Sequence, residues 1–529
     1  YQRRSTWGQC VCKHGLLGWD IPVGWILAVL SLGLVYLYST WPYDRFKKLG
    51  IPGPRPWPLV GNNISLIRKG VHRFQEEIHQ QYGKIVGFYE GRTPLLSVKD
   101  PEILKEIMVK EFNHFKNRRV IIEDPPMDKT LLVLADEHWH KVRRIMTSAF
   151  STGKLKQMTT TMNECAKTMI SNLGEEMKRN GYVDVRRLAN MFSMDVISGV
   201  GFGIKVDSQK NPDDPFVKHA RNVFHLRLHC LLLRSTLPTV WKFLQKFSLV
   251  TNIPRSTLKF FSGITAQLVD GRRNSDKQNV DFLSLMLRGV SLKPDSEETS
   301  TGTKEDAASY EAKVKANKAL TPDEITGNSM VFFTAGSETT ATTLAILWYS
   351  LALNPEVQQR VIEEIRTVIG DKDEITQETA NQLPYLDRCI QEALRIHSPA
   401  TRVGRICTED TEINGLKIPR GTNIIIPIAA MHMDPKYWPE PHKFDPDRYL
   451  PEAKEARHPL TWIPFGFGPR NCIGMRLALL EAKVAAAKVL QKFYFRPCAK
   501  TEVPLKIKKT FGVLLNTENP IILQAESHK

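Results

Sequence analysis

The feature that most restricts how this chain can fold is an apolar stretch near its N-terminus. No charged residue occurs from Ile21 to Ser39. As a helix this stretch would span roughly 28 Å, close to the thickness of a bilayer core. A cleaved signal peptide usually has a shorter apolar part and a small-residue cleavage site, and no such site is evident. The sequence therefore predicts a transmembrane anchor over residues 21–40, preceded by an N-terminal segment of residues 1–20.

The stretch that follows, residues 41–58, is basic and rich in proline. Its repeated prolines disfavour a helix and favour a stiff, extended path. We interpret it as a linker to one catalytic domain, residues 59–529, with a protein-binding proline tract as the alternative. Within that domain, residues 291–320 are rich in Ser, Glu, Lys and Thr, with Tyr310 as the only aromatic residue. Such a composition buries too little apolar surface to offset the cost of ordering, so we predict a mobile loop.

Composition limits the class of protein and its partners. Apolar residues at 42% and charged residues at 24% are typical of a globular protein. The formal charge of +17 favours an acidic partner: nucleic acid, anionic lipid or an acidic protein surface. The chain has no compact run of basic residues interleaved with stacking aromatics, so we do not expect nucleic acid as a binding partner. The eight cysteines are too dispersed for a disulfide framework and predict thiols in a reducing compartment.

The pattern along the body predicts a mainly α fold with a small β portion. Two short β-rich stretches, Ile85–Tyr89 and Pro94–Val98, precede many helical segments. The candidate helices are Asp136–Phe150, Leu155–Asn180, Asp195–Gly201, Pro355–Gly370, Leu383–Ile396 and Met475–Phe493.

The residues that carry chemistry lie near the C-terminus, in the loop Phe465–Gly474. Its glycines let the backbone turn tightly and approach a flat cofactor, while Pro469 stiffens it. A helix beginning at Met475 would direct its N-terminal dipole at Cys472 and favour a thiolate there. A thiolate can ligate a metal. The alternative is an inert, buried cysteine in a glycine-rich turn.

This loop resembles the Phe-x-x-Gly-x-Arg-x-Cys-x-Gly signature of the cytochrome P-450 superfamily. Three further stretches match that family in the expected order, namely Ala335–Thr340, Glu392–Arg395 and Pro446–Tyr449. The resemblance covers nearly all of residues 41–529. It implies the cytochrome P-450 fold, here preceded by one transmembrane helix, and haem b (iron protoporphyrin IX) held by the Cys472 thiolate.

The stretch Ala335–Thr340 resembles the oxygen-activating turn of the family. Thr339 stands four residues after Ala335, so its hydroxyl can bond that carbonyl and bend the helix. Gly336 would leave a space for dioxygen and water. By resemblance, Glu338 and Thr339 are the catalytic residues and deliver protons; without it, they would be ordinary helix residues.

Haem propionates need cationic partners. Trp139 and Arg143 lie at i and i+4, which puts an indole donor and a guanidinium on one helix face. Arg119 could take the place of its neighbour Arg118. By resemblance, the cofactor-binding residues are Arg118, Trp139, Arg143, Arg405, Phe465, Arg470 and Cys472.

Glu392 and Arg395 are neighbours on one helix face. As an exposed pair they would contribute well under ~1 kcal/mol. The resemblance instead implies a buried structural triad with Arg448, from which no member can be removed without leaving a charge unpaired.

Phe115–Arg119, Asp434–Trp438 and Gly468–Arg476 resemble the family-3 (3A-type) branch that oxidises drugs and steroids. That branch implies a large lipophilic pocket. Thr334 is polar where relatives often have an aromatic residue. The matching pocket positions are Leu132, Val331, Phe332, Thr334, Ala335, Ala400, Thr401 and Val513.

The function implied is a monooxygenase that inserts one oxygen atom of O2 into lipophilic substrates. NADPH would supply electrons through a separate NADPH-cytochrome P-450 reductase, with cytochrome b5 as a further donor. The chain lacks a nucleotide-binding fingerprint of its own, because Gly199-x-Gly201-x-Gly203 has the wrong spacing. Lys141 and Lys154 are candidates for docking the reductase. We expect an endoplasmic reticulum location with the catalytic domain facing the cytosol.

Two alternatives remain open. One is a haem-thiolate isomerase of the thromboxane synthase type, which would need neither the reductase nor the pair Glu338–Thr339. The other is a non-catalytic haem sensor.

Overall fold

The computed structural model describes residues 23–120, 122–211, 214–223, 227–247, 249–273, 281–288, 320–512 and 514–528. The N-terminal segment 1–20 lies outside the described residues, as does nearly all of the loop predicted at 291–320. The pocket candidate Val513 also lies outside them.

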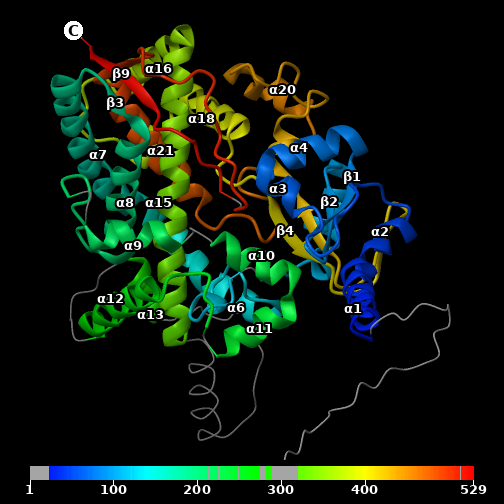
Figure 1. Ribbon diagram of the computed structural model, residues 1–529. Coiled ribbons are helices and arrows are strands. Elements are labelled where there is room, and N and C mark those ends of the chain that lie inside the picture. The colour runs from blue at the N-terminus through cyan, green and yellow to red at the C-terminus, as the bar shows by residue number, and fades with distance from the viewer. Residues whose placement is uncertain are drawn as a thin grey trace, which may run out of the picture.

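Helices dominate the described chain, as the sequence predicted, and small sheets lie on opposite sides of the helices (Figure 1). The helices are α1 (Val23–Thr40), α2 (Asp44–Lys48), α3 (Asn63–Lys69), α4 (Val71–Tyr82), α5 (Pro101–Lys105), α6 (Asp136–Thr147), α7 (Thr152–Asn180), α8 (Val185–Phe202), α9 (Pro215–Val223), α10 (Leu228–Thr236), α11 (Pro238–Lys246), α12 (Arg255–Arg273), α13 (Phe282–Arg288), α15 (Pro322–Leu353), α16 (Pro355–Val368), α17 (Gln377–Asn381), α18 (Pro384–Ile396), α19 (Ile428–His432), α20 (Pro451–Glu455) and α21 (Met475–Leu490).

The strands form three sheets within the described residues. They are β1 (Ile85–Glu90), β2 (Thr93–Val98), β3 (Val183–Asp184), β4 (Val403–Ile406), β5 (Thr411–Ile413), β6 (Leu416–Ile418), β7 (Asn423–Ile426), β8 (Phe493–Arg496) and β9 (Ile522–Ser527). The largest sheet has the order β1-β2-β7-β4, in which β2 and β7 are parallel and the other pairs antiparallel. Its edge strand β4 carries Arg405 toward the functional site.

Helix α15 runs through the middle of the molecule (Figure 1). It begins at Pro322 because Thr321 and Glu324 cap it reciprocally, each side chain accepting a hydrogen bond from the backbone N–H of the other. From Thr340 to Ala352 every side chain is buried. This helix is therefore a fixed wall against which the functional site is built.

Two glycines let α15 pack closely on α8. A Cβ on Gly336 would lie 2.6 Å from Cδ1 of Ile197, and a Cβ on Gly201 would lie 2.6 Å from Cε1 of Phe332. Both distances are well below carbon–carbon contact. The side chain of Ile197 therefore occupies the place that a side chain on Gly336 would take.

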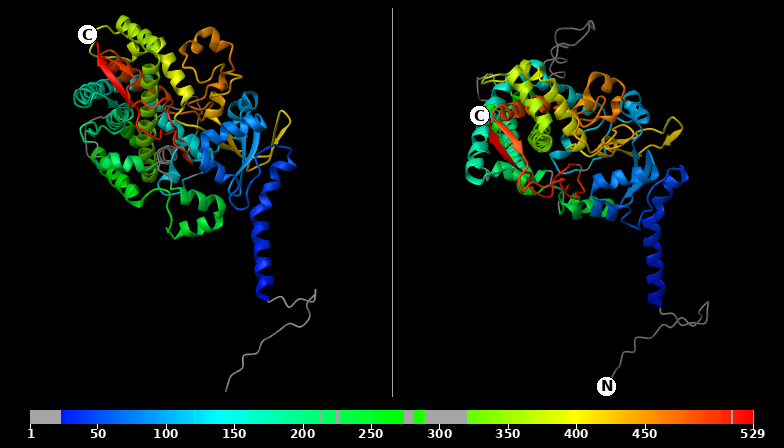
Figure 2. Two further views of the ribbon diagram at one scale, coloured as in Figure 1. Left: turned by 45° about the horizontal axis from the view of Figure 1, so that its top comes forward. Right: turned by 90° about the horizontal axis from the view of Figure 1, so that it is seen from above.

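The first helix, α1, projects from the rest of the molecule (Figure 2). Its side chains from Val23 to Tyr38 are exposed and almost all apolar, and no other described helix is long and apolar enough to cross a membrane. Where α1 meets the domain, the guanidinium of Arg92 lies 3.5 Å from the ring centre of Tyr38. Such a helix, apolar on all sides and unpacked, is a candidate membrane span.

The segment 41–58 packs on the domain rather than forming a free spacer. Phe46 is buried against Tyr89, with ring centroids 5.3 Å apart. Farther along, a Cβ on Gly53 would lie only 1.8 Å from the carbonyl oxygen of Gly87, so the two backbones touch. The segment therefore fixes where α1 leaves the domain.

Most helix boundaries differ from the prediction by a few residues, but α8 begins ten residues before the predicted 195–201. Its start is set by Asp184, whose carboxylate accepts hydrogen bonds from the N–H groups of Arg186 and Arg187. The helix is buried on nearly every side, so the sequence has no amphipathic period to reveal its first half.

Candidate active site

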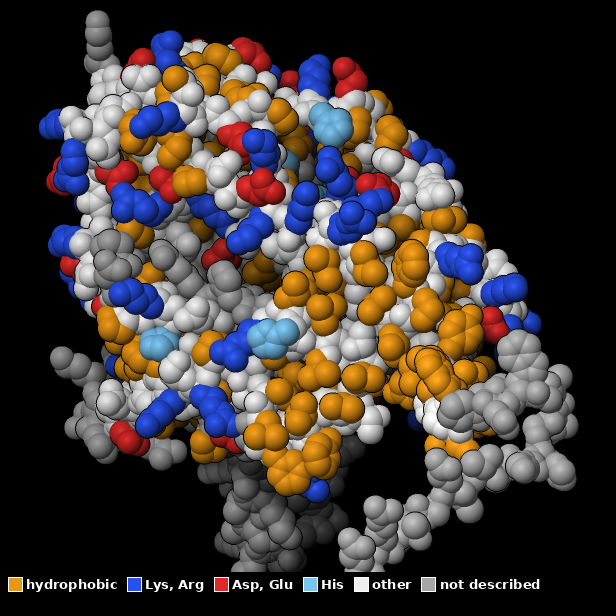
Figure 3. Space-filling model, viewed as in Figure 1, with side chains coloured by type: hydrophobic (Ala, Val, Ile, Leu, Met, Phe, Trp, Pro, Cys, Tyr) orange, Lys and Arg blue, Asp and Glu red, His pale blue; other side chains and the backbone are white. Residues whose placement is uncertain are grey.

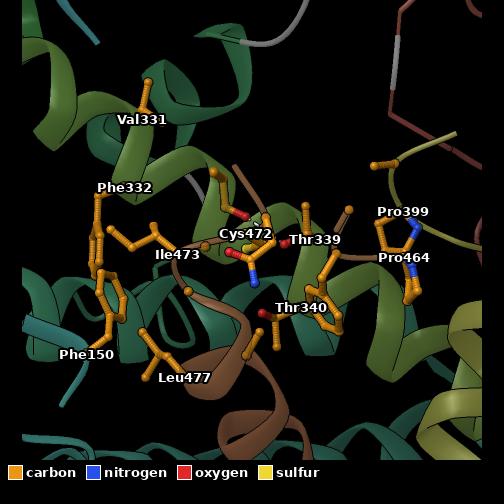
Figure 4. A pocket seen from close by; sticks show the side chains of 18 of the residues that line it. Phe150, Val331, Phe332, Thr339, Thr340, Pro399, Pro464, Cys472, Ile473 and Leu477 are labelled. Atoms are coloured by element: carbon orange, nitrogen blue, oxygen red, sulfur yellow. Dashed lines mark hydrogen bonds between the residues drawn. The ribbon is translucent and has the colours of Figure 1, made fainter. Parts of the chain in front are cut away.

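A cavity of about 310 Å³ lies between α15, α6, the residues before β4 and the loop that leads into α21. Its walls are mostly apolar. Figure 4 shows Cys472 near the centre, with Phe150 and Phe332 on one side and Pro399 and Pro464 on the other. A cavity with mostly apolar walls and a few convergent polar groups is the usual form of a small-molecule site.

The loop 465–474 presents Cys472 to this cavity. Gly466 and Gly468 have φ angles of +70° and +72°, which side chains rarely allow. A Cβ on Gly468 would also lie 2.1 Å from the carbonyl oxygen of Met108. The Cys472 N–H then donates to the carbonyl of Phe465 at 2.8 Å and closes the loop. The position of the sulfur is thus fixed by backbone geometry.

The Cys472 side chain is surrounded by protein yet opens onto the cavity. Burial raises the pKa of its thiol, while the Gly474 N–H and the charges of Arg143 and Arg118 lower it. No other cysteine of the described residues lines the cavity. Once a metal replaces the proton, the same hydrogen bond and charges would stabilise the thiolate.

Three arginines, the buried Arg405 and Arg470 and the partly exposed Arg118, meet beside the cavity, and none of them forms an ion pair with a carboxylate among the described residues. Burial and mutual repulsion lower the pKa of Arg470 to about 9 and hold that of Arg405 well below its usual value. Burial, with repulsion from Arg143, lowers the pKa of Arg118 to about 10. Each has a buried guanidinium N–H that finds no acceptor among the described residues. Such a cluster is complete only with an anionic ligand.

Two further cofactor candidates, Arg143 and Trp139, lie beside the Cys472 loop. Arg143 donates from both terminal nitrogens to the backbone and side-chain oxygens of Asn471, each at 3.0 Å. Trp139 is buried, and the guanidinium of Arg470 lies 4.6 Å from its ring centre. The structure also separates the two neighbouring arginines, because Arg119 pairs with Glu90 at 2.8 Å while Arg118 lines the cavity.

These donors fit an iron porphyrin. A sulfur that opens onto the cavity can ligate iron, unpaired buried cations can take two carboxylates, and apolar walls can enclose a flat macrocycle. The sequence singled out Arg118, Trp139, Arg143, Phe465, Arg470 and Cys472, all of which line the cavity. Arg405 does not line it but is coupled electrostatically to Arg118 and Arg470.

The two catalytic candidates on α15 point in different directions. The Thr339 hydroxyl lines the cavity and donates to the carbonyl of Ala335 at 2.7 Å, as the spacing predicted. Glu338 does not line the cavity, and its carboxylate accepts from Arg186 of α8 at 3.1 Å. The structure therefore brings only Thr339 to the place where a substrate would react.

Glu392, Arg395 and Arg448 do lie together. Arg395 donates to both oxygens of Glu392 at 2.8 Å, and Nε of Arg448 lies 3.3 Å from the same carboxylate. The sequence missed two further donors to Glu392, the hydroxyl of Tyr449 at 3.2 Å and the N–H of Asp445 at 3.1 Å. Neither could be found by spacing, because both come from a turn distant in sequence.

The pocket candidates divide into two groups. Those that line the cavity are Leu132, Val331, Phe332, Ala335 and Ala400. Thr334 and Thr401 are buried and do not line it. The Thr334 hydroxyl donates back to the Met330 carbonyl at 2.8 Å, so its polarity is satisfied within α15. Phe332 is held by a stacked ring, that of Phe282, with centroids 4.1 Å apart.

Comparison with known proteins agrees with this arrangement. The family model of cytochrome P450 matches residues 51–524. The chain belongs to the cytochrome P450 family. It is 39% identical to cytochrome P450 3A7 of Homo sapiens over 509 residues, 95% of this chain and 96% of that one. It is 38% identical to cytochrome P450 3A9 of Rattus norvegicus over 509 residues, with the same coverage. It is also 38% identical to lithocholate 6-beta-hydroxylase of Mesocricetus auratus over 507 residues, 95% of this chain and 96% of that one.

The predicted superfamily, the 3A-type branch, the fold class and the enzyme class are therefore confirmed. The chain is a cytochrome P450 monooxygenase, and the cofactor of its family is haem with a cysteine thiolate ligand.

Sequence reasoning missed a buried acid at the edge of this cavity. Glu481 of α21 is fully buried and lines the cavity, and neither carboxylate oxygen has a hydrogen-bond partner among the described residues. Burial raises its pKa to about 8, with the Ser193 hydroxyl as the opposing influence. The residue therefore holds a proton at neutral pH. An acid within the apolar pattern of α21 was the only signal that could have revealed it.

This raised pKa predicts a pH-dependent cost of folding. Unfolding exposes Glu481 and returns its pKa to about 4.3. Below that pH the carboxyl is protonated in both states and does not change the free energy of unfolding. Above it the unfolded chain releases the proton that the native state keeps, so the free energy of unfolding falls as the pH rises. Relative to Glu481→Gln, the free energy of unfolding of wild type should fall by about 1.4 kcal/mol per pH unit between about pH 4.5 and 8. The total fall should be about 4 to 5 kcal/mol.

Chemical unfolding of both proteins at pH 5 and pH 8 measures this difference. Glu455→Gln, which alters an exposed acid, is the control and should show no growing difference. If the difference in free energy of unfolding between wild type and Glu481→Gln is the same at pH 5 and pH 8, Glu481 ionises normally.

Proposed function

We propose that this cytochrome P450 hydroxylates lipophilic, steroid- or drug-like substrates with electrons from NADPH. The observation that carries the proposal is one cavity in which the Cys472 sulfur, unpaired arginines and Thr339 meet among apolar walls. The name of the Mesocricetus auratus relative describes a steroid hydroxylase, which supports a steroid as the first probe.

Cys472 would ligate the haem iron, and the arginines would hold the propionates. Arg118, Arg405 and Arg470 have the unpaired N–H donors for this role, and Trp139 lies beside Arg470. Bound there, haem would supply the redox chemistry that activates dioxygen. The Gly474 N–H and the first turn of α21 would stabilise the thiolate, because both direct positive charge at the sulfur.

Thr339 would deliver protons inside the cavity. Its hydroxyl donates to the Ala335 carbonyl, which leaves its oxygen free to accept a hydrogen bond from water. Glu338 lies on the other side of the helix turn, where it pairs with Arg186 and is partly exposed. It would pass protons from solvent toward Thr339. The side chains of Val331, Phe332 and Ala400 would hold an apolar substrate nearby.

Thr339→Ala should separate electron consumption from product formation. We expect product formed per NADPH to fall by roughly tenfold or more, within the range of one lost proton-transfer group, while NADPH oxidation continues. Thr339→Ser keeps the hydroxyl and should remain close to wild type. Equal product yields in Thr339→Ala and wild type would remove Thr339 from the proton path.

Electrons would come from NADPH-cytochrome P-450 reductase, with cytochrome b5 as a further donor. The Arg143–Asn471 contacts and the hydrogen bond from Arg476 to Thr152 at 2.7 Å place the α6–α7 corner beside the Cys472 loop. Lys141 and Lys154 lie on these two helices and would contribute to the docking of an acidic partner.

We also propose an endoplasmic reticulum location with the catalytic domain in the cytosol. The exposed apolar helix α1 supports anchorage by a single span. The absence of a disulfide among the described cysteines is compatible with a reducing compartment.

The test uses the full chain, reconstituted with lipid, haem, reductase and NADPH. Lithocholate and a panel of lipophilic drugs are offered under ¹⁸O2. We expect hydroxylated products that carry one labelled oxygen and require both NADPH and reductase. Turnover of an endoperoxide without NADPH would support the isomerase instead, and haem binding with no oxidation of any probe would support a sensor.

A further inference from the structure

One wall of the cavity is supported from behind by a residue that does not line it. Phe332 of α15 lines the cavity, as does Phe150, which follows α6. Figure 4 shows both rings at the same edge of the cavity. Phe282 of α13 does not line the cavity, yet its ring stacks on that of Phe332 with centroids 4.1 Å apart and planes inclined by 19°. One face of the Phe332 ring is thus covered by an element outside the site.

The ring of Phe332 has little room on its other sides. The rings of Phe150 and Phe202 lie 6.1 Å and 5.9 Å from it, measured between centroids. A Cβ on Gly201 would lie 2.6 Å from Cε1 of Phe332, so the backbone of α8 approaches the ring closely. In a close-packed interior the loss of even one methylene group from a neighbour is felt. The position of Phe332 therefore depends on Phe282.

Phe282 is itself held in place. It is buried and contributes nothing to the hydrophobic surface that Figure 3 shows around α10 and α11. The preceding residue, Asp281, accepts a hydrogen bond from the N–H of Ser284 at 2.8 Å and so caps the start of α13. Asp281 also pairs with Arg272 of α12, which donates to the carbonyl of Phe202 at 2.7 Å. These contacts tie the start of α13 to α12 and to the end of α8.

We propose that Phe282 is a positioning residue for the substrate. It keeps Phe332 in place, and Phe332 limits how far an apolar substrate extends on this side of the cavity. Such a limit decides which carbon atom of the substrate lies at the reacting centre, because the walls are mostly apolar and offer few polar groups to orient a substrate. The proposal rests on the proposed oxidation of lipophilic substrates. It assigns specificity to α13, none of whose described residues lines the cavity.

Binding of n-alkylbenzenes, from toluene to octylbenzene, to the full-length, haem-loaded protein tests the proposal. The shift in haem spin state without NADPH gives each dissociation constant. In wild type we expect the dissociation constant to fall about fourfold per added methylene until the chain meets Phe332, and then to stop falling. In Phe282→Leu and Phe282→Ala, Phe332 can turn into the space behind it. The fall should then continue for at least one more methylene, so that the longest probes bind about fourfold more tightly than in wild type.

Tighter binding of long probes distinguishes this role from a purely structural one, because a variant that only loses stability does not gain affinity. Hydroxylation of hexylbenzene with reductase and NADPH gives a second readout. The ratio of benzylic to chain-end products should change by roughly tenfold in Phe282→Leu, the usual effect of one methylene in an apolar pocket.

Phe261→Leu is the matched control. Phe261 is as deeply buried as Phe282, but its ring contacts those of Phe216 and Phe333 rather than that of Phe332. This variant should change neither the length limit nor the product ratio. Phe332→Leu should change both, and adding Phe282→Leu to it should have little further effect, because Phe282 acts through Phe332.

An unchanged length limit in the Phe282 variants would overturn the proposal, as would an equal change in Phe261→Leu or the absence of a limit in wild type. Phe282→Leu, the smaller change in volume, decides the matter if Phe282→Ala does not fold. A length limit that moves as expected, with no hydroxylated product from any probe, would refute the proposed oxidation alone. No binding of any alkylbenzene would refute both.

Discussion

Cys472→Ser is expected to abolish thiolate ligation and reduce hydroxylation to the level measured without enzyme. Serine keeps the shape of cysteine, but its hydroxyl does not ionise at neutral pH and cannot give iron the electron density that a thiolate gives. The loop should survive, because its closure depends on the Cys472 N–H and on positive φ angles at Gly466 and Gly468 rather than on the sulfur.

The measurement is the reduced, carbon monoxide-bound spectrum, together with haem content and product formation. Cys498→Ser is the matched control, since Cys498 is a partly exposed cysteine that does not line the cavity. It should keep the wild-type spectrum. An unaltered Soret band in Cys472→Ser would remove Cys472 as the ligand, and with it the proposed placement of the cofactor.

Glu392→Gln is expected to destabilise the fold by about 3 to 5 kcal/mol, the usual cost of breaking a buried ion pair. Glu392 and Arg395 are fully buried, so the remaining guanidinium would have no carboxylate and no water. The variant would also weaken the hydrogen bonds from Tyr449 and Asp445, which link α18 to the turn at 446–449. Chemical unfolding of wild type and variant measures the loss.

Asp447→Asn provides a contrast on the same face of the protein. Asp447 pairs with Arg360 and Arg388 but is itself 39% exposed, so its loss should cost about 1 kcal/mol or less. Similar costs for the two variants would mean that burial does not set the strength of the Glu392 pair. A loss of activity in Glu392→Gln should follow haem content, because this residue lies outside the cavity.

The sequence predicted the parts of the site that depend on local geometry. The Thr339 hydroxyl reaches the Ala335 carbonyl because both lie on one turn of one helix. The glycines around Cys472 mark a tight loop because positive φ angles need them. The N-terminal helix was predictable because an uncharged apolar run of this length is typical of a membrane span, and α1 is exposed rather than packed in the core.

The sequence could not predict which way a side chain faces between elements. Glu338 and Thr339 are neighbours, yet one pairs with Arg186 on α8 and the other lines the cavity. Arg118 and Arg119 are neighbours as well, and only the position of Glu90 on β1 decides which of them pairs away from the site. Both outcomes depend on partners far away in sequence.

By itself, the sequence determined the family, the helical character and the apolar N-terminal helix, and it predicted which sulfur would ligate the haem, because these follow from local backbone rules and from an ordered set of motifs. Only the tertiary structure decided that Arg118, Arg405 and Arg470 lie close together beside the cavity without an ion pair to a carboxylate among the described residues, and that Glu481 is buried without a hydrogen bond there. The reason is that the cost of a buried charge depends on every element packed around it, and no single segment contains that information.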